Sequence, residues 1–287
     1  MKDFKELHEI DLELELLSGS SLYVGNIEIP SYTLSEIKEY GYSDYMTSLQ
    51  FISVDIEDFI SSVHDMEKRI VLEQEKTNLK SYDFFMSLGG AELRDKTMTA
   101  IAMILKTNDL YIIDDSIAVG FMEMGILVEN EHGELVVDVD VLDITEQEDL
   151  KIVHRGNFDD IVEAVKLQNY LKRPVKKEKS DDDNPADEAT RALMEQMKKM
   201  KEKVEQKKKK QREQEGNDED EVNIATIISA ISSKSNSINK LNIWNFTIYQ
   251  LYDEYSRLEL IDNYDFSIRA MMAGAEKIEL THWSSKL

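Results

Sequence analysis

Apolar positions in the first 173 residues follow strand spacing in several short runs. Leu22-Tyr23-Val24 and Ile27-Glu28-Ile29 flank Gly25-Asn26, a turn pair that tolerates positive φ, so the pattern predicts a small hairpin. Comparable runs predict four more strands: Leu110–Ile113, Ile117–Val119, Ile126–Val128 and Leu135–Val137. A turn at Glu131-His132-Gly133 joins the last two into a second hairpin.

Helical spacing alternates with these strands. Thr33-Leu34-Ser35-Glu36 has the form of a capping box and predicts a helix towards Tyr40. Asp55 is placed to cap a longer helix whose apolar face ends at Met66, and two further helices are expected on either side of Gly89-Gly90. Asn157 is placed to cap the last helix of this block. Residues 1–173 are therefore expected to form an α+β N-terminal domain.

Residues 174–222 differ sharply in composition from the sequence on either side. From Val175 to Val222 there is no aromatic residue, and 13 basic and 15 acidic residues alternate in blocks. So little apolar surface cannot offset the entropy of ordering a core. Leu193, Met197, Met200 and Val204 form one thin apolar stripe. We expect a charged, partly helical linker, disordered elsewhere.

Helical patterns return in residues 223–287. Thr247 is placed as an N-cap, and Ile248, Leu251, Tyr252 and Tyr255 lie on one stripe after it. Aromatic residues concentrate here, which is typical of surfaces that bind proteins, although a domain of this size also needs aromatics for its own core. We expect a small all-α C-terminal domain.

Composition and charge limit the classes of partner that the chain can bind. The chain has 287 residues, 34 basic against 58 acidic, and a formal net charge of −24. This surplus argues against nucleic acid or anionic lipid as a partner. It also disfavours self-association, which nevertheless stays open. No apolar window is long enough for a membrane span, and Met1–Glu6 lacks the apolar core of a signal peptide.

Candidate catalytic and metal sites are weak. The chain contains no cysteine and no glycine-rich phosphate loop. Its five histidines lack metal-ligand spacing. Asp138 and Asp140, expected to share a strand face, leave open a hydrolase that uses a hard metal, but no base or arginine cluster accompanies them. We therefore predict no catalytic residue, no metal, no cofactor and no enzymatic activity.

Two segments carry a family resemblance. Pro-Ser-Tyr-Thr-Leu-Ser-Glu-Ile-Lys-Glu-Tyr-Gly-Tyr at 30–42 resembles the opening of tail assembly chaperones of phages that infect Gram-positive bacteria. Asn-Ile-Trp-Asn-Phe-Thr-Ile-Tyr-Gln-Leu-Tyr-Asp-Glu-Tyr at 242–255 is similar to the C-terminal segment of their long forms. There too, a Tyr-Asp pair, an Ala-Gly-Ala run and a terminal His-Trp follow in this order. The two stretches cover under half of the chain, and the strands around 109–143 depart from the smallest members.

The resemblance implies a late-gene protein without enzymatic activity, in the cytoplasm of the infected host. Such chaperones coat the tape measure protein before tail tube subunits polymerise along it. Some are made in a short and a long form, and the long form adds a tube-binding module by translational frameshifting. The expected partners are thus the tape measure protein and the tail tube protein. The residues that we predict to contact partners are Tyr32, Leu34, Ile37, Tyr40, Trp244, Tyr249, Tyr252 and Trp283. A structural protein retained in the tail or baseplate is the alternative.

Overall fold

The computed structural model describes residues 2–54, 56–62, 66–76, 78–88, 90–130, 132–146, 149–172, 223–274 and 280–286. Contacts divide the chain into two compact units. The first contains Met1–Pro174 and Ile231–Leu287, and the second contains Val175–Ala230. The predicted linker, 174–222, lies outside the described residues, as does its apolar stripe.

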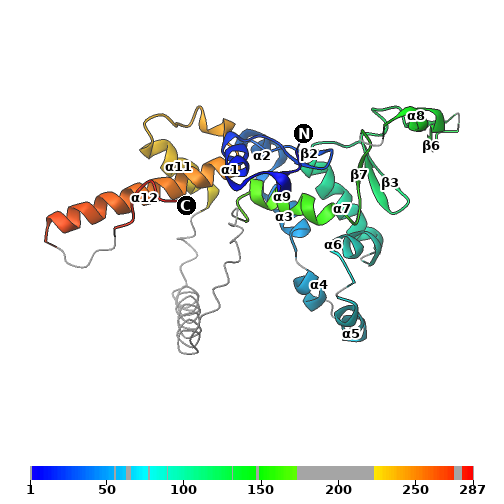
Figure 1. Cartoon of the computed structure of the whole chain (residues 1–287), viewed down its shortest axis with the longest axis horizontal. Helices are drawn as coiled ribbons and strands as arrows, with labels where there is room; N and C mark the ends of the chain where they lie inside the picture. Colours follow the sequence, from blue (N-terminus) through cyan, green and yellow to red (C-terminus); the bar gives the residue numbers. More distant parts are fainter. Residues whose placement is uncertain are drawn as a thin grey trace. The chain divides into compact units, whose positions relative to one another are not determined.

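The described N-terminal part is a mixture of short helices and strands (Figure 1). Its helices are η1 (Phe4–Glu6), α1 (Glu9–Ser18), α2 (Leu34–Tyr40), α3 (Tyr42–Ile52), α4 (Ile56–Ser62), α5 (Met66–Glu75), α6 (Ser81–Asp83), the π-helix η2 (Phe84–Leu88), α7 (Gly90–Ile104), α8 (Val139–Ile144) and α9 (Phe158–Gln168). Its strands are β1 (Leu22–Val24), β2 (Ile27–Ile29), β3 (Leu110–Ile113), β4 (Ser116–Val119), β5 (Leu127–Glu129), β6 (Leu135–Val137) and β7 (Lys151–Val153).

The main core forms where the β1–β2 hairpin packs on α9, with α2, α3 and α7 nearby. The hairpin pairs Leu22 with Ile29 and Val24 with Ile27, so all four side chains point into the core on one face. Phe158, the first residue of α9, is fully buried and contacts Tyr82 and Phe85 edge-on or tilted at 5.4 and 5.7 Å between ring centroids. The hairpin that the sequence predicts is confirmed.

A second, smaller core belongs to the strands that follow α7. β3, β4 and β7 form an antiparallel sheet in that order, and β5 pairs with β6 in a separate hairpin. The buried residues of this core are Ala118, Phe121, Ile126 and Leu127. Asp114 and Asp115 have φ values of 45° and 61°, which make the tight turn from β3 to β4. All four predicted strands are present, within one residue at each end.

Two local predictions need correction. Asp138 and Asp140 do not share a strand face, because β6 ends at Val137 and Asp138 is instead the N-cap of α8, accepting hydrogen bonds from the amides of Asp140 and Val141. Asn157 precedes α9, but its side chain bonds to the backbone of His154 and Ile152 and leaves the helix uncapped. The expected long helix is described as two elements, α4 and α5, while Asp55, its predicted cap, and residues 63–65 lie outside the described residues.

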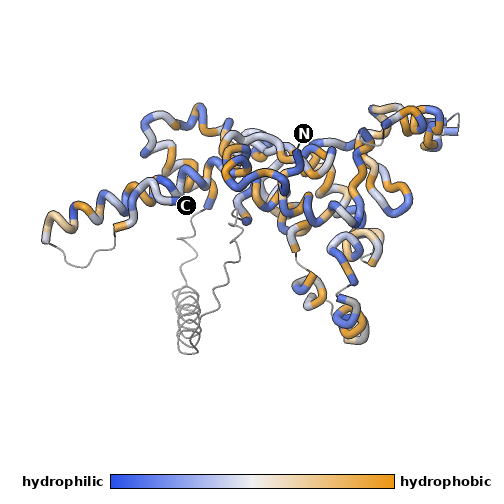
Figure 2. Tube along the Cα trace, viewed as in Figure 1, coloured by the Kyte–Doolittle hydropathy of each residue, from blue (hydrophilic) through white to orange (hydrophobic). Residues whose placement is uncertain are grey.

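Helices make up most of the remaining described residues. They are α11 (Ile224–Lys234), η4 (Ile243–Asn245) and the long helix α12 (Ile248–Met272). Hydrophobic and hydrophilic residues alternate along α12 without a continuous apolar side (Figure 2). Only Ile248, Tyr249 and Leu251, all in its first turn, are fully buried. The predicted fold class, α+β followed by helices, is confirmed for the described residues.

Candidate protein-binding surfaces

The N-terminal ends of α2 and α12 meet in the first compact unit. Thr33 and Thr247 form an isolated antiparallel bridge, and the amide of Leu34 donates a 2.7 Å hydrogen bond to the carbonyl of Phe246. Each threonine is also the N-cap of the helix that follows it. One short backbone pairing therefore fixes the starting points of two helices that lie far apart in the sequence.

Both helices begin with a complete capping box. The Thr33 hydroxyl accepts from the amide of Glu36 at 3.3 Å, and the Glu36 carboxylate accepts from the amide of Thr33 at 2.8 Å. At the other helix, Gln250 replaces the glutamate and accepts from the amide of Thr247 at 2.8 Å. The amide group of Gln250 also donates a 2.8 Å bond to the carbonyl of Leu17 in α1. The second capping box therefore also anchors α12 to α1.

Apolar side chains are buried in both helices near these ends. Leu34 and Ile37 of α2 are 3% and 2% exposed, and Leu251 of α12 is completely buried. Gly19 ends α1 at φ 74°, and a Cβ added there would lie 3.1 Å from Cγ2 of Thr247. A glycine is thus required both by the backbone angle and by the closeness of α12.

Aromatic rings extend the interface to α9. Tyr170, which follows α9, stacks on Tyr252 with 5.5 Å between centroids and an interplanar angle of 12°. Its ring also meets Tyr249 edge-on at 5.4 Å. Burial raises the pKa of the Tyr252 hydroxyl, with a smaller contribution from Tyr42. Pairs of this kind contribute about 0.5–1.5 kcal/mol beyond their buried area.

Trp244 and Lys38 add a contact at the edge of the same interface. The Lys38 ammonium lies 5.3 Å from the centroid of the Trp244 ring, within the range of a cation–π interaction. The indole N–H donates a 2.9 Å hydrogen bond to the carbonyl of Lys240. Trp244 is therefore held by its own segment and presents its ring to α2.

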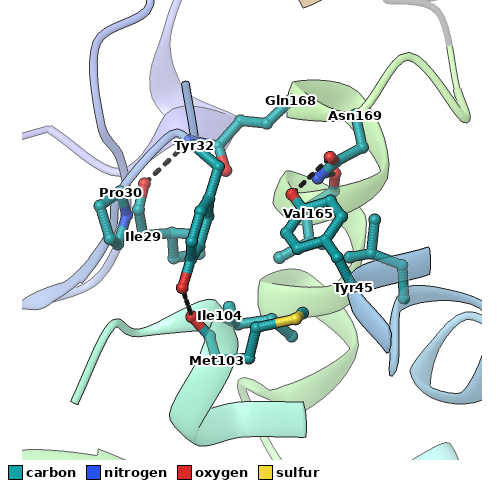
Figure 3. A pocket seen from close by; sticks show the side chains of 10 residues that line it. Ile29, Pro30, Tyr32, Tyr45, Met103, Ile104, Val165, Gln168 and Asn169 are labelled. Atoms are coloured by element: carbon teal, nitrogen blue, oxygen red, sulfur yellow. Dashed lines mark hydrogen bonds between the residues drawn. The ribbon is translucent and has the colours of Figure 1, made fainter. Parts of the chain in front are cut away.

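Tyr32 lies on the other side of α2 and is also anchored. Its hydroxyl donates a 2.5 Å bond to the carbonyl of Met103 (Figure 3). The Lys106 ammonium lies 4.3 Å from its ring centroid. Burial, with the nearby Glu36 charge, raises the pKa of Tyr32 to about 12. Burial also acts to raise the pKa of Glu36, but hydrogen bonds from Lys106 and Thr33 outweigh it and hold that pKa below its ordinary value.

The cavity beside Tyr32 is too small for a substrate. Tyr32 and Tyr45 line it with Gln168 and Asn169 of the α9 region, whose amide groups bond to the carbonyls of Ile29 and Val165 (Figure 3). Its volume is about 10 Å³. A single water molecule needs about that much space. This cavity therefore has no room for a small-molecule ligand.

The last described residues fold back on α12 and α1. One nitrogen of the Arg257 guanidinium donates to the carbonyls of Trp283 and Ser285, both at 2.8 Å. Lys286 forms ion pairs with Glu9 and Glu13 of α1. The Trp283 ring contacts His282 and remains 47% exposed.

The structure thus brings five of the eight predicted contact residues to the elements that meet around the Thr33–Thr247 bridge. Leu34, Ile37 and Tyr249 are buried there, and Trp244 and Tyr252 are partly buried. Tyr32 is partly buried elsewhere, against Met103 and Lys106. Tyr40 is 40% exposed and packs on Tyr45, whereas Trp283 lies in the returning tail. Contact of these residues with another protein stays a prediction. What the sequence did not predict is that the two groups contact each other.

Sequence reasoning missed two exposed apolar surfaces. Ile10, Leu14 and Leu17 form a stripe along α1, and the first two are 59% and 58% exposed. The spacing of four and then three residues could have revealed it. The second surface covers β6 and α8, and its exposed members are Leu135, Val136, Val137, Val139 and Ile144. Contiguous exposed apolar surface commonly marks an interaction site.

The acidic candidates for a metal do not gather in the part of the chain described here. Among those residues, no group of three or more His, Cys, Asp or Glu side chains is placed to hold an ion. His132 lies in the turn between β5 and β6, where its amide bonds to Asn130. None of the described helices combines the length and apolar character needed to cross a bilayer.

A family model described as the YomV second domain matches residues 207–287. The match suggests a phage-protein family. It includes η4 and α12, and therefore the part of the chain that pairs with α2. No curated protein and no solved structure matches the chain.

Proposed function

We propose that this protein is a phage tail assembly chaperone that binds the tape measure protein and recruits tail tube subunits. It would act in the cytoplasm of the infected host, without enzymatic activity. The similarity of residues 207–287 to a phage-protein family supports the setting. The resemblance of segments 30–42 and 242–255 to tail assembly chaperones supports the role.

The exposed stripe on α1 is the observation that carries the client-binding part of the proposal. Ile10, Leu14 and Leu17 present an apolar ridge, and the helix around them contains four acidic residues and no basic one. An acidic ridge of this kind complements an amphipathic helix with apolar and basic positions. Covering such a stripe on a long helical client would keep the client from aggregating before the tube assembles.

Co-expression tests the client. The full chain is co-purified with the candidate tape measure protein and, separately, with the tube protein. The double variant Ile10→Asp/Leu14→Asp should reduce capture of the tape measure protein about tenfold or more, because each exposed side chain that becomes buried contributes roughly 1.5–3 kcal/mol. Leu241→Asp changes an apolar residue outside α1 that is even more exposed, at 90%, and should leave capture intact. Equal capture of the tape measure protein by the wild type, the double variant and Leu241→Asp would exclude the α1 stripe as the client site.

The alternative is a structural protein of the tail or baseplate. The exposed apolar surface of β6 and α8 is compatible with permanent burial in a particle. Quantitative mass spectrometry of purified virions separates the two functions. A chaperone should be absent or far below the copy number of the tube protein, whereas a stoichiometric amount would favour the structural role.

A further inference from the structure

The two segments that pair at Thr33 and Thr247 are a nine-residue repeat. The first repeat, Ile29–Ile37, reads Ile-Pro-Ser-Tyr-Thr-Leu-Ser-Glu-Ile, and the second repeat, Ile243–Leu251, reads Ile-Trp-Asn-Phe-Thr-Ile-Tyr-Gln-Leu. Isoleucine, an aromatic residue, threonine, an aliphatic residue, Glu or Gln and a final aliphatic residue recur at the same positions. Antiparallel pairing of equivalent residues places a local two-fold axis between the threonines.

The repeats share their buried positions. Ile29 and Ile243, the first residue of each, are both completely buried, as is the last residue of the second repeat. In each repeat the threonine caps a helix through the same reciprocal pair of hydrogen bonds. The likeness therefore extends from the sequence to the burial and bonding of equivalent residues.

The differences between the repeats show which of the two acts as the docking segment. Where the first repeat has Pro30 and Ser35, the second has Trp244 against Lys38 and Tyr249 against Tyr170. Where the first has the charged Glu36, the second has the neutral Gln250, which bonds to α1. Two first repeats facing each other would lose these contacts. The surface of α1, α2 and the end of α9 is thus a receptor for the second repeat.

We propose that the second repeat of one copy of this chain docks on the receptor of a second copy. Exchange between copies preserves every contact of the interface, including the pairing of Lys286 with the acidic face of α1. Fifty residues, 173–222, separate the last described residue before the predicted linker from Asn223. Fully extended, they reach at most about 170 Å, enough to span to a neighbouring molecule.

Exchange would depend on protein concentration. Docking within one chain dominates in dilute solution, and docking between copies gains as the concentration approaches the effective concentration within one chain, on the order of millimolar. Copies crowded on one partner would then become linked. This inference does not depend on which protein, if any, is the client.

A cross-linking experiment on the unmodified chain tests the exchange. Equal amounts of ¹⁴N and ¹⁵N chains are unfolded and refolded together at about 1 mM. Refolding the mixture ensures that slow opening of the folded interface does not prevent exchange. A carbodiimide then joins Lys286 to Glu9. Peptide pairs that mix the isotopes should appear, approaching half of all such pairs if exchange is complete, and should decline on dilution. Only unmixed pairs at every concentration would overturn the proposal.

Variants assign the exchange to the second repeat. Leu251→Asp places a charge in the receptor and should abolish the mixed pairs, whereas Leu241→Asp, at a 90% exposed position just outside the repeat, should retain them. Mixed pairs that survive Leu251→Asp would show that another surface joins the copies, and would overturn the assignment.

The absence of cysteine allows an independent test. Directly opposed residues of this kind lie close enough for a disulfide. Full-length Thr33→Cys and Thr247→Cys chains, mixed and oxidised, should form a disulfide-linked dimer that neither forms alone. A dimer of Thr33→Cys alone would mean that first repeats pair, which contradicts the proposal. The double variant Thr33→Cys/Thr247→Cys should also be oxidised. If its disulfide closes within one chain while the mixture of single variants gives no dimer, docking occurs only within one chain, and the proposal is overturned.

Discussion

Thr33 and Thr247 face each other across a two-residue antiparallel bridge, and each caps a helix that starts at the next residue. The bridge joins the N-terminal block to a segment that the sequence assigns to a separate helical domain. There α2 contacts η4, and α12 contacts α1. The stability of the N-terminal block should therefore depend on residues of the C-terminal segment.

Leu251→Ala tests this dependence. Leu251 is completely buried against the N-terminal block, so removing its side chain should lower the free energy of unfolding by about 2–5 kcal/mol. Urea unfolding followed by far-UV circular dichroism measures the change. Leu241→Ala, at an exposed position, should change it by less than about 0.5 kcal/mol. Equal effects of the two substitutions would show that the segment contributes little to the fold.

Gly19→Ala tests the closeness of α1 and α12. The substitution forces alanine to φ 74° and places its Cβ 3.1 Å from Thr247, so it should destabilise the fold by more than backbone strain alone. Gly25→Ala is the matched control, because Gly25 also has positive φ (58°) but nothing within 4 Å of the added Cβ. Strain alone costs roughly 1–2 kcal/mol. Thermal unfolding of both variants should show a larger loss for Gly19→Ala, and equal losses would argue against the close approach.

Glu36→Gln should make stability less dependent on pH. Burial opposes ionisation of Glu36, but its bonds to Lys106 and Thr33 lower its pKa in the folded protein. The charged form thus stabilises the fold above the ordinary pKa of glutamate, and this contribution disappears as pH falls through the lowered value. Glutamine keeps the cap acceptor, as Gln250 does in the second repeat.

Chemical unfolding from pH 7 down to pH 3 measures the effect. The wild-type protein should be more stable than Glu36→Gln at pH 7, and the difference should shrink steadily as the solution is acidified. Glu39→Gln removes an exposed carboxylate from the same helix and serves as the control. Parallel curves for wild type and Glu36→Gln would mean that the bond to Lys106 has no energetic effect.

Arg257→Ala should release the returning tail. Arg257 is the donor to the carbonyls of Trp283 and Ser285, and alanine removes both hydrogen bonds. In a Trp244→Phe background, acrylamide quenching of Trp283 fluorescence should increase, because the indole gains access to solvent. Arg269→Ala changes an exposed arginine of the same helix and should leave quenching unchanged. Quenching that does not respond to Arg257→Ala would place the tail contacts elsewhere.

Local structure could be predicted from the sequence because its causes are local. The hairpin at Gly25-Asn26 depends only on a tight turn, and the Thr33 capping box closes within four residues. Both features were predicted from the sequence, and both are confirmed. The prediction that Asp138 lies on a strand was wrong, because the strand ends at Val137 and the aspartate caps the helix that follows. A period-two pattern does not distinguish these outcomes over three residues.

The pairing of α2 with α12 could not be predicted in the same way. Helical periodicity shows that Leu34, Ile37 and Leu251 need cover, but it does not show what covers them. The repeat is the signal that could have revealed the contact, yet only its isoleucine and threonine are identical. Without the contact, the two groups of aromatic and apolar residues were interpreted as separate surfaces for other proteins.

The Thr33–Thr247 bridge also has a consequence for biosynthesis. A ribosome adds roughly 5–20 residues per second, so α2 emerges on the order of ten to forty seconds before the segment that covers it. During that interval Leu34 and Ile37 lack their native neighbours, and the nascent block must be protected or remain partly folded. Translation speed through the second half of the message would thus influence how much of the protein reaches its native state.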